Sequence, residues 1–90
     1  MTKPKAENII VTRRVFEKTI DDNDIRNKLI DLVVFEWEKQ PENDKRFFVI
    51  NYDGRFDLWV VYTDYTIANE EDPENYPMRE VYTVMFPEEY

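Results

Sequence analysis

Two aromatic-rich runs flank the chain's single glycine in the stretch KRFFVINYDGRFDLWVVYTDY. Asp-Gly between two apolar runs is a strong signal for a β-hairpin. Two registers fit this signal. A type I′ turn at Asp53-Gly54 pairs Tyr52 with Arg55, whereas a type I turn that starts at Asn51 pairs Asn51 with Arg55. Asparagine at the first turn position and Gly54 in the left-handed fourth position favour the second register.

Both registers give the second strand of the hairpin the same two faces, because side chains alternate along a strand. One face carries only apolar and aromatic side chains: Phe56, Leu58, Val60 and Tyr62. The other face carries Asp57, Trp59, Val61 and Thr63. The first set is the better core. We therefore expect Trp59 to point outward, next to Asp57 and beside Phe47 or Phe48.

The segment DDNDIRNKLIDLVVFEWEKQP predicts a helix that ends before Pro41 and is capped by Asp22, Asn23 or Asp24. Its apolar side chains sweep an arc of about 200° on a helical wheel, which is wider than one sheet face needs. Glu36 and Arg26 interrupt this arc. Either the helix is packed on two sides within its own chain, or part of the arc meets another chain. We favour the first.

The rest of the chain completes a small domain. Residues 1–7 are expected to be flexible, and ENIIVTRRVFEK predicts a first strand near residues 8–17. Pro73 and Pro77 indicate an irregular loop from about Thr66 to Met78, before a last strand near 80–86. The element order β-α-β-β-β predicts an α+β fold over residues 8–90, with a small antiparallel sheet of about four strands packed on one amphipathic helix.

The composition excludes several kinds of chemistry. The 90 residues contain no histidine and no cysteine, which removes the commonest general base, thiolate nucleophiles, disulfides and the commonest transition-metal ligands. One glycine cannot build a glycine-rich phosphate loop. We therefore expect a non-catalytic protein without a cofactor or metal. No apolar run approaches the ~20 residues of a membrane span, and no signal-peptide pattern is present, so we expect a cytoplasmic protein.

The net charge of −8 is unevenly distributed. Residues 1–20 carry five basic and two acidic residues, a net of +3, while the other seventy carry seven basic and eighteen acidic, a net of −11. From Phe56 onward, nine acids face Arg79 alone. Direct binding of nucleic acid is not expected, since phosphate contacts need lysine and arginine. A basic protein, one that itself binds nucleic acid, is the natural complement.

The acids are densest in NEEDPENYPMRE, which contains Glu70, Glu71, Asp72 and Glu74. Carboxylates two residues apart on a strand lie about 6.6–7 Å apart, close to the spacing of phosphates along a nucleic-acid strand. Aromatic side chains beside acids supply anchors that lose their water in an interface. The predicted partner-binding residues are therefore Glu70, Glu71, Asp72, Glu74, Asp57, Trp59, Tyr65 and Tyr76.

In general character, this small, acidic, aromatic-rich composition is similar to that of small inhibitors carried by phages and mobile elements. These include DNA and RNA mimics that block host nucleases and defence systems. The leading hypothesis is an inhibitor that occludes the basic surface of a nucleic-acid-handling protein. One alternative is an assembly subunit that forms a homodimer or larger homo-oligomer through an apolar sheet face and the helix. A further alternative is an immunity or antitoxin protein.

Overall fold

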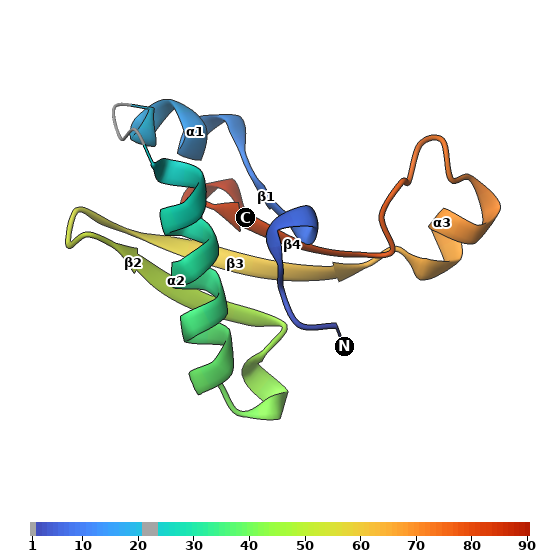
Figure 1. Ribbon diagram of the computed structural model, residues 1–90, viewed down its shortest axis with the longest axis horizontal. Helices are drawn as coiled ribbons and strands as arrows, with labels where there is room; N and C mark the ends of the chain where they lie inside the picture. The colour runs from blue at the N-terminus through green and yellow to red at the C-terminus, as the bar shows by residue number, and fades with distance from the viewer. Residues whose placement is uncertain (1, 21–23) are drawn as a thin grey trace.

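The computed structural model describes residues 2–20 and 24–90, which form a four-stranded sheet with helices (Figure 1). The strand order is β1-β4-β3-β2, in which β1 runs parallel to β4 and the other neighbours are antiparallel. The α+β fold is confirmed, but the sheet is mixed rather than wholly antiparallel. The α-helices and strands are β1 (Ile9–Val11), α1 (Arg13–Thr19), α2 (Ile25–Lys39), β2 (Phe47–Tyr52), β3 (Phe56–Asp64), α3 (Thr66–Glu71) and β4 (Glu80–Met85), and the short 3-10 helices are η1 (Ala6–Asn8), η2 (Glu42–Asp44) and η3 (Pro87–Glu89).

The hairpin turn differs from both expected registers, because the β2–β3 ladder begins at the pair Tyr52 and Phe56. Asp53 and Gly54 both have left-handed backbone, with φ of 52° and 72°. Left-handed backbone at Asp53 contradicts the favoured type I turn, in which that position is right-handed. The backbone N–H of Arg55 donates to the Tyr52 carbonyl at 2.8 Å, as in a type I′ turn. Arg55 itself has no partner in the β2–β3 ladder, because Tyr52 pairs with Phe56.

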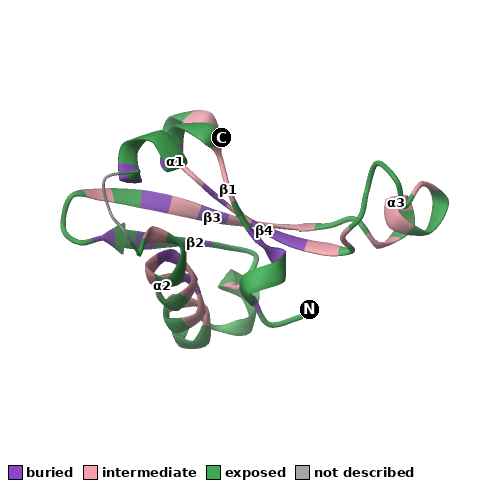
Figure 2. Cartoon of the chain, turned by 45° about the horizontal axis from the view of Figure 1, so that its top comes forward, coloured by how far each residue is buried: buried purple, intermediate pink, exposed green. Residues whose placement is uncertain are grey.

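The expected faces of β3 are confirmed. Leu58 and Val60 are fully buried, whereas Asp57 is exposed and Trp59 is half-buried on the opposite face. Helix α2 packs on the first of these faces (Figure 2). The core formed there includes Ile9, Leu29, Val33, Phe48, Ile50, Tyr52, Leu58, Val60, Tyr82 and Val84.

Helix α2 runs from Ile25 to Lys39, as its sequence predicts. Asp24 occupies the N-cap position, but its carboxylate accepts from the side-chain amide of Asn27 and makes no cap bond to the backbone. The other two predicted caps, Asp22 and Asn23, lie outside the described residues. At the C-terminal end, the backbone N–H of Gln40 donates to the Trp37 carbonyl, and Pro41 follows.

The expected first strand is wrong beyond Val11, because residues 13–19 form helix α1. The Thr12 hydroxyl accepts from the backbone N–H of Val15 at 3.3 Å and so caps the first turn. The helix then buries Val15 and Thr19. A threonine cap followed by a residue that packs into the core outweighs the strand preference of the β-branched residues around it.

The expected irregular loop is wrong at its start, because residues 66–71 form helix α3. The Asp64 carboxylate accepts from the backbone N–H of Thr66 at 2.9 Å, which satisfies a donor that the helix start leaves unpaired. Hydrogen bonds from the Thr66 side chain and backbone lower the pKa of Asp64. Pro73 follows the C-cap residue Asp72 and disfavours continuation of the helix beyond Glu71.

The first residues lie against the sheet and α2. Thr2 donates to the Glu80 carboxylate from both its backbone N–H and its hydroxyl. Pro4 is fully buried, and the Lys3 ammonium lies 2.6 Å from the Glu38 carboxylate, which lowers the pKa of Glu38. The expected flexibility of residues 1–7 stays a prediction.

Candidate protein-binding surface

The sheet has an outer face, defined here as the face opposite α2, which carries Ile10, Phe47, Val49, Trp59, Val61, Thr63, Val81, Thr83 and Met85. Ile10, Phe47 and Val49 are 39%, 38% and 44% exposed. Exposed apolar side chains that stand together on one sheet face are typical of an interaction surface rather than of a solvated one.

An aromatic cluster stands on this outer face. The ring centroids of Phe47 and Trp59 are 4.8 Å apart, and that of Tyr90 lies 5.5 Å from each of them. All three contacts are edge-to-face, the arrangement that the charge distribution of aromatic rings favours. The sequence prediction that Trp59 points outward beside a phenylalanine is confirmed, and the phenylalanine is Phe47.

Residues 65–79, called the arm, extend from the end of β3 away from the rest of the molecule (Figure 1). The backbone N–H of Tyr65 donates to the Arg79 carbonyl at 2.6 Å and closes the base of the arm. Inside the arm, the Asn69 side-chain amide donates to the Tyr76 carbonyl at 2.6 Å. The rings of Tyr65 and Tyr76 lie 5.6 Å apart. These bonds give the arm a defined shape despite its short helix.

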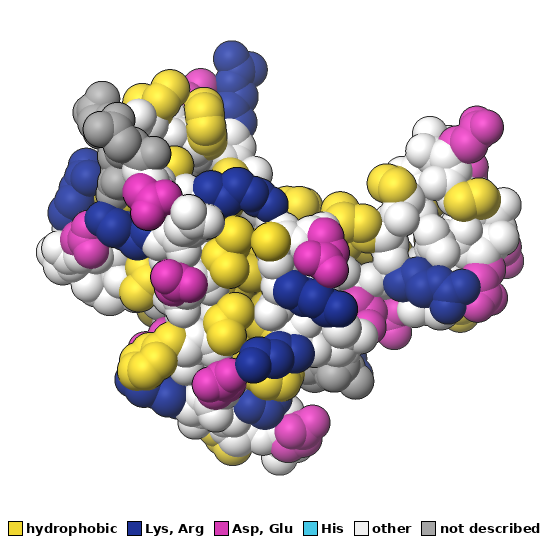
Figure 3. Space-filling model, in the orientation of Figure 1, with side chains coloured by type: hydrophobic (Ala, Val, Ile, Leu, Met, Phe, Trp, Pro, Cys, Tyr) yellow, Lys and Arg dark blue, Asp and Glu magenta, His cyan; other side chains and the backbone are white. Residues whose placement is uncertain are grey.

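The arm is acidic. It contains four acids and one basic residue, a net charge of −3. The Arg79 guanidinium lies 3.9 Å from Glu70, and both side chains are more than half exposed, so the pair is screened by water. Asp72 accepts from the Asn75 side chain at 2.8 Å. Acidic side chains stand at several places along the outer edge of the arm in Figure 3, which gives this end of the molecule a negative field.

At the base of the arm, the carboxylate of Glu80 accepts hydrogen bonds from Tyr62 and Thr2. These bonds lower the pKa of Glu80. Burial, and then the bond to Glu80, raise the pKa of Tyr62 well above its usual range. Glu80 therefore stays ionised and adds a fixed negative charge where the arm leaves the sheet.

The arm and the outer face meet in a groove of about 210 Å³. From the arm, Tyr65 and Tyr76 line it, and from the sheet, Ile10, Val81 and Thr83. The two tyrosines thus continue the apolar outer face. In the chain, the four acids of the arm lie between Tyr65 and Tyr76, two of the residues that line this groove.

The structure arranges the eight predicted partner-binding residues in three places rather than in one cluster. Six of them belong to the arm: Tyr65, Glu70, Glu71, Asp72, Glu74 and Tyr76. Trp59 lies on the outer face, about 17 Å along β3 from Asp64, since strands rise ~3.4 Å per residue. Asp57 lies near the hairpin turn, where its carboxylate accepts from the Asn51 amide at 2.9 Å. The candidate surface is therefore elongated.

Sequence reasoning placed Val61 on the same face as Trp59, but it missed Val49, Ile10 and Tyr90. The alternation in FFVINY could have placed Val49 on the same face as Phe47. Ile10 gave no such signal, because its place depends on the pairing of β1 with the distant β4. Tyr90 gave none either, since η3 carries it from the end of β4 onto Trp59.

Across residues 2–20 and 24–90, no three acidic side chains gather closely enough to hold a metal ion. Within the same ranges, the helices are too short or too polar to cross a membrane. Comparisons with protein-family models, with curated proteins and with solved structures find no match to this chain.

Proposed function

We propose that this chain is a non-catalytic inhibitor that acts in the cytoplasm by occluding the basic surface of a nucleic-acid-handling protein. The observation that carries the proposal is the contiguity of the acidic arm with an exposed apolar sheet face. Four carboxylates stand on the arm, and the groove lined by Tyr65 and Tyr76 links it to the outer face.

The two parts of the surface have different roles in binding. The arm and Glu80 attract lysine and arginine side chains over several ångströms, which speeds association and orients the partner. The cluster of Phe47, Trp59 and Tyr90 supplies rings that are already packed against one another. A partner that covers these rings gains apolar burial without a large loss of side-chain freedom. In this proposal the acidic side chains determine which partner binds, and burial of the three rings stabilises the complex.

The test is capture of binding proteins from a host lysate on the immobilised chain, with elution in a salt gradient. We expect a nucleic-acid-binding protein to elute at moderate salt. A variant with Glu70, Glu71, Asp72 and Glu74 changed to lysine should bind this protein at least tenfold more weakly, or ~1.4 kcal/mol.

A matched control changes four exposed acids outside the arm to lysine, with the same change in net charge: Glu7, Asp31, Glu42 and Asp44. Equal losses in the two variants would mean that total charge, not the arm, determines binding. Unchanged binding of the arm variant would contradict the proposal.

A homo-oligomer is the second candidate, and the exposure of Phe47 and Val49 on an uncovered sheet face favours it. Two outer faces that pack on each other would bury these side chains, as in a sheet-on-sheet sandwich. Light scattering distinguishes this candidate. If the outer face self-associates, the Val49→Lys variant should show a lower molar mass in solution than the unmodified chain. If it does not, both should be monomeric.

A further inference from the structure

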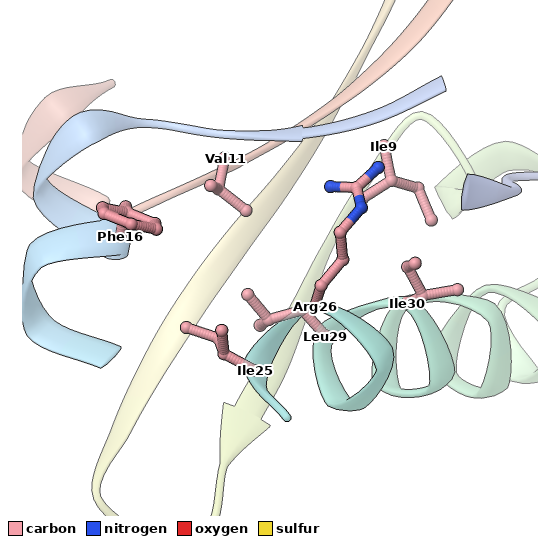
Figure 4. A pocket seen from close by; sticks show the side chains of 7 residues that line it. All are labelled: Ile9, Val11, Phe16, Ile25, Arg26, Leu29 and Ile30. Carbon is pink, nitrogen blue, oxygen red and sulfur yellow. The ribbon is translucent and has the colours of Figure 1, made fainter. Parts of the chain in front are cut away.

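A small apolar pocket lies between α1, β1 and α2, away from the surface described above (Figure 4). Its volume is about 120 Å³. The β1 residues that line it, Ile9 and Val11, alternate with Ile10 and so belong to the α2 side of the sheet. This pocket therefore does not share a face with the arm groove, and an occupant of one leaves the other free.

Six of the seven side chains that line the pocket are apolar: Ile9, Val11, Phe16, Ile25, Leu29 and Ile30. They come from three elements whose separation is fixed by other contacts. Val15 and Thr19 anchor α1, and Leu29 and Val33 anchor α2, so the two helices do not close on each other. Phe16 is left 48% exposed at the edge of the pocket. Apolar walls without atoms between them forfeit dispersion contacts that a ligand of the right size would restore.

The seventh lining side chain is Arg26, which interrupts the apolar arc of α2. Figure 4 shows it rising from α2 toward β1, with its guanidinium near Ile9. One of its N–H groups donates to the Ala6 carbonyl at 2.7 Å. Among the residues that the structure describes, this is its single hydrogen-bond partner, so further donors of the guanidinium face the pocket mouth or solvent.

We propose that this pocket binds a small apolar monocarboxylate, with its hydrocarbon part among the isoleucines and its carboxylate on Arg26. A guanidinium presents N–H donors in a fork that matches a carboxylate. The size of the hydrocarbon part follows from the volume, because a dry cavity of about 150 Å³ accommodates benzene. Acids of roughly five to seven carbons therefore fit. The inference is independent of the proposed inhibitor function.

The experiment is a titration of the ¹⁵N-labelled chain with hexanoate, followed by backbone amide chemical shifts, beside the neutral isostere 1-hexanol and the shorter acetate. We expect hexanoate to shift amides of β1, α1 and the first half of α2, and to bind at least tenfold more tightly than 1-hexanol. Acetate should cause no saturable shift, since it cannot fill the apolar part.

Two arginine variants test the role of the guanidinium. Arg26→Gln should lower hexanoate affinity to that of 1-hexanol, while amides outside the pocket keep their shifts and so report an intact fold. Arg13→Gln removes an exposed arginine of α1 that does not line the pocket, and it should leave hexanoate binding unchanged. The proposal is overturned if hexanoate and 1-hexanol bind equally well, if neither binds at millimolar concentration, or if Arg26→Gln keeps the preference.

Discussion

Tyr62 donates its hydroxyl hydrogen to the carboxylate of Glu80 at 2.5 Å, where β3 and β4 leave the core for the arm. Thr2 donates to the same carboxylate from the first residues of the chain. One side chain thus joins three segments, and these bonds hold the pKa of Glu80 below its ordinary value of 4.5.

The lowered pKa of Glu80 predicts acid sensitivity. A carboxyl whose pKa is depressed in the folded state stabilises the fold above its unfolded pKa, and this contribution is lost as the pH falls through the folded pKa. Glu80→Gln should lower the free energy of unfolding at about pH 7 and should flatten its fall between roughly pH 5 and 3. Urea unfolding at several pH values measures both. Glu74→Gln, in the arm, should reproduce the unmodified curve.

The Thr12 hydroxyl predicts a capping effect. It accepts from the backbone N–H of Val15 and donates to the Glu89 carboxylate at 2.9 Å, so it ties α1 to η3. Thr12→Ala should lower the free energy of unfolding by about 1 kcal/mol, the usual effect of losing an N-cap. Thr12→Ser keeps the hydroxyl and should lose much less. Equal losses for the two variants would assign the effect to the methyl group.

The turn predicts a backbone effect at Gly54. Its φ of +72° is unfavourable for residues with a Cβ, although a Cβ added there would meet no atom within 4 Å. Gly54→Ala should therefore lower the free energy of unfolding by about 1–2 kcal/mol through the backbone alone. Gly54→Asn should lose less, since asparagine tolerates this conformation. Thermal unfolding that ranks the two variants in the opposite order would contradict the left-handed turn.

We expect alanine substitutions at two neighbouring residues of β2 to differ in size of effect, because one residue faces the core and the other the outer face. Ile50 is 1% exposed and packs in the core, whereas Val49 is 44% exposed. Ile50→Ala should lower the free energy of unfolding by roughly 2–5 kcal/mol. Val49→Ala should lower it by less than about 1 kcal/mol. Urea unfolding of the two variants measures which face of the sheet is the core, and a larger loss for Val49→Ala would reverse the assignment.

The sequence predicts those parts of the fold that depend on local signals. The predicted helix starts after Asp24 and ends before Pro41, as α2 does, and Asp53-Gly54 locates the hairpin. The strict alternation from Phe56 onward identifies the core face of β3, since a one-residue slip would bury Asp57. The final strand near residues 80–86 is also confirmed as β4.

Other parts depend on side-chain hydrogen bonds or on distant partners. The Thr12 hydroxyl caps the seven-residue helix α1, and the Asp64 carboxylate accepts from the Thr66 backbone N–H at the start of the six-residue helix α3. Such short segments have no clear hydrophobic period of their own. For the candidate surface, the charge pattern identified the acidic residues of the arm. The contact between the arm and the outer face could not be predicted, because it depends on how the chain returns from the arm to β4.

The parallel pairing of β1 with β4 has a consequence for the order of folding. Ile9 lies opposite Tyr82, so the first strand must wait for the last one before it can join the sheet. During synthesis, α2 and the β2–β3 hairpin can form as they leave the ribosome, while Ile9–Val11 stays unpaired until Glu80–Met85 has been made. Pairings between residues so far apart in sequence slow folding. The sheet is therefore completed only after Glu80–Met85 has left the ribosome.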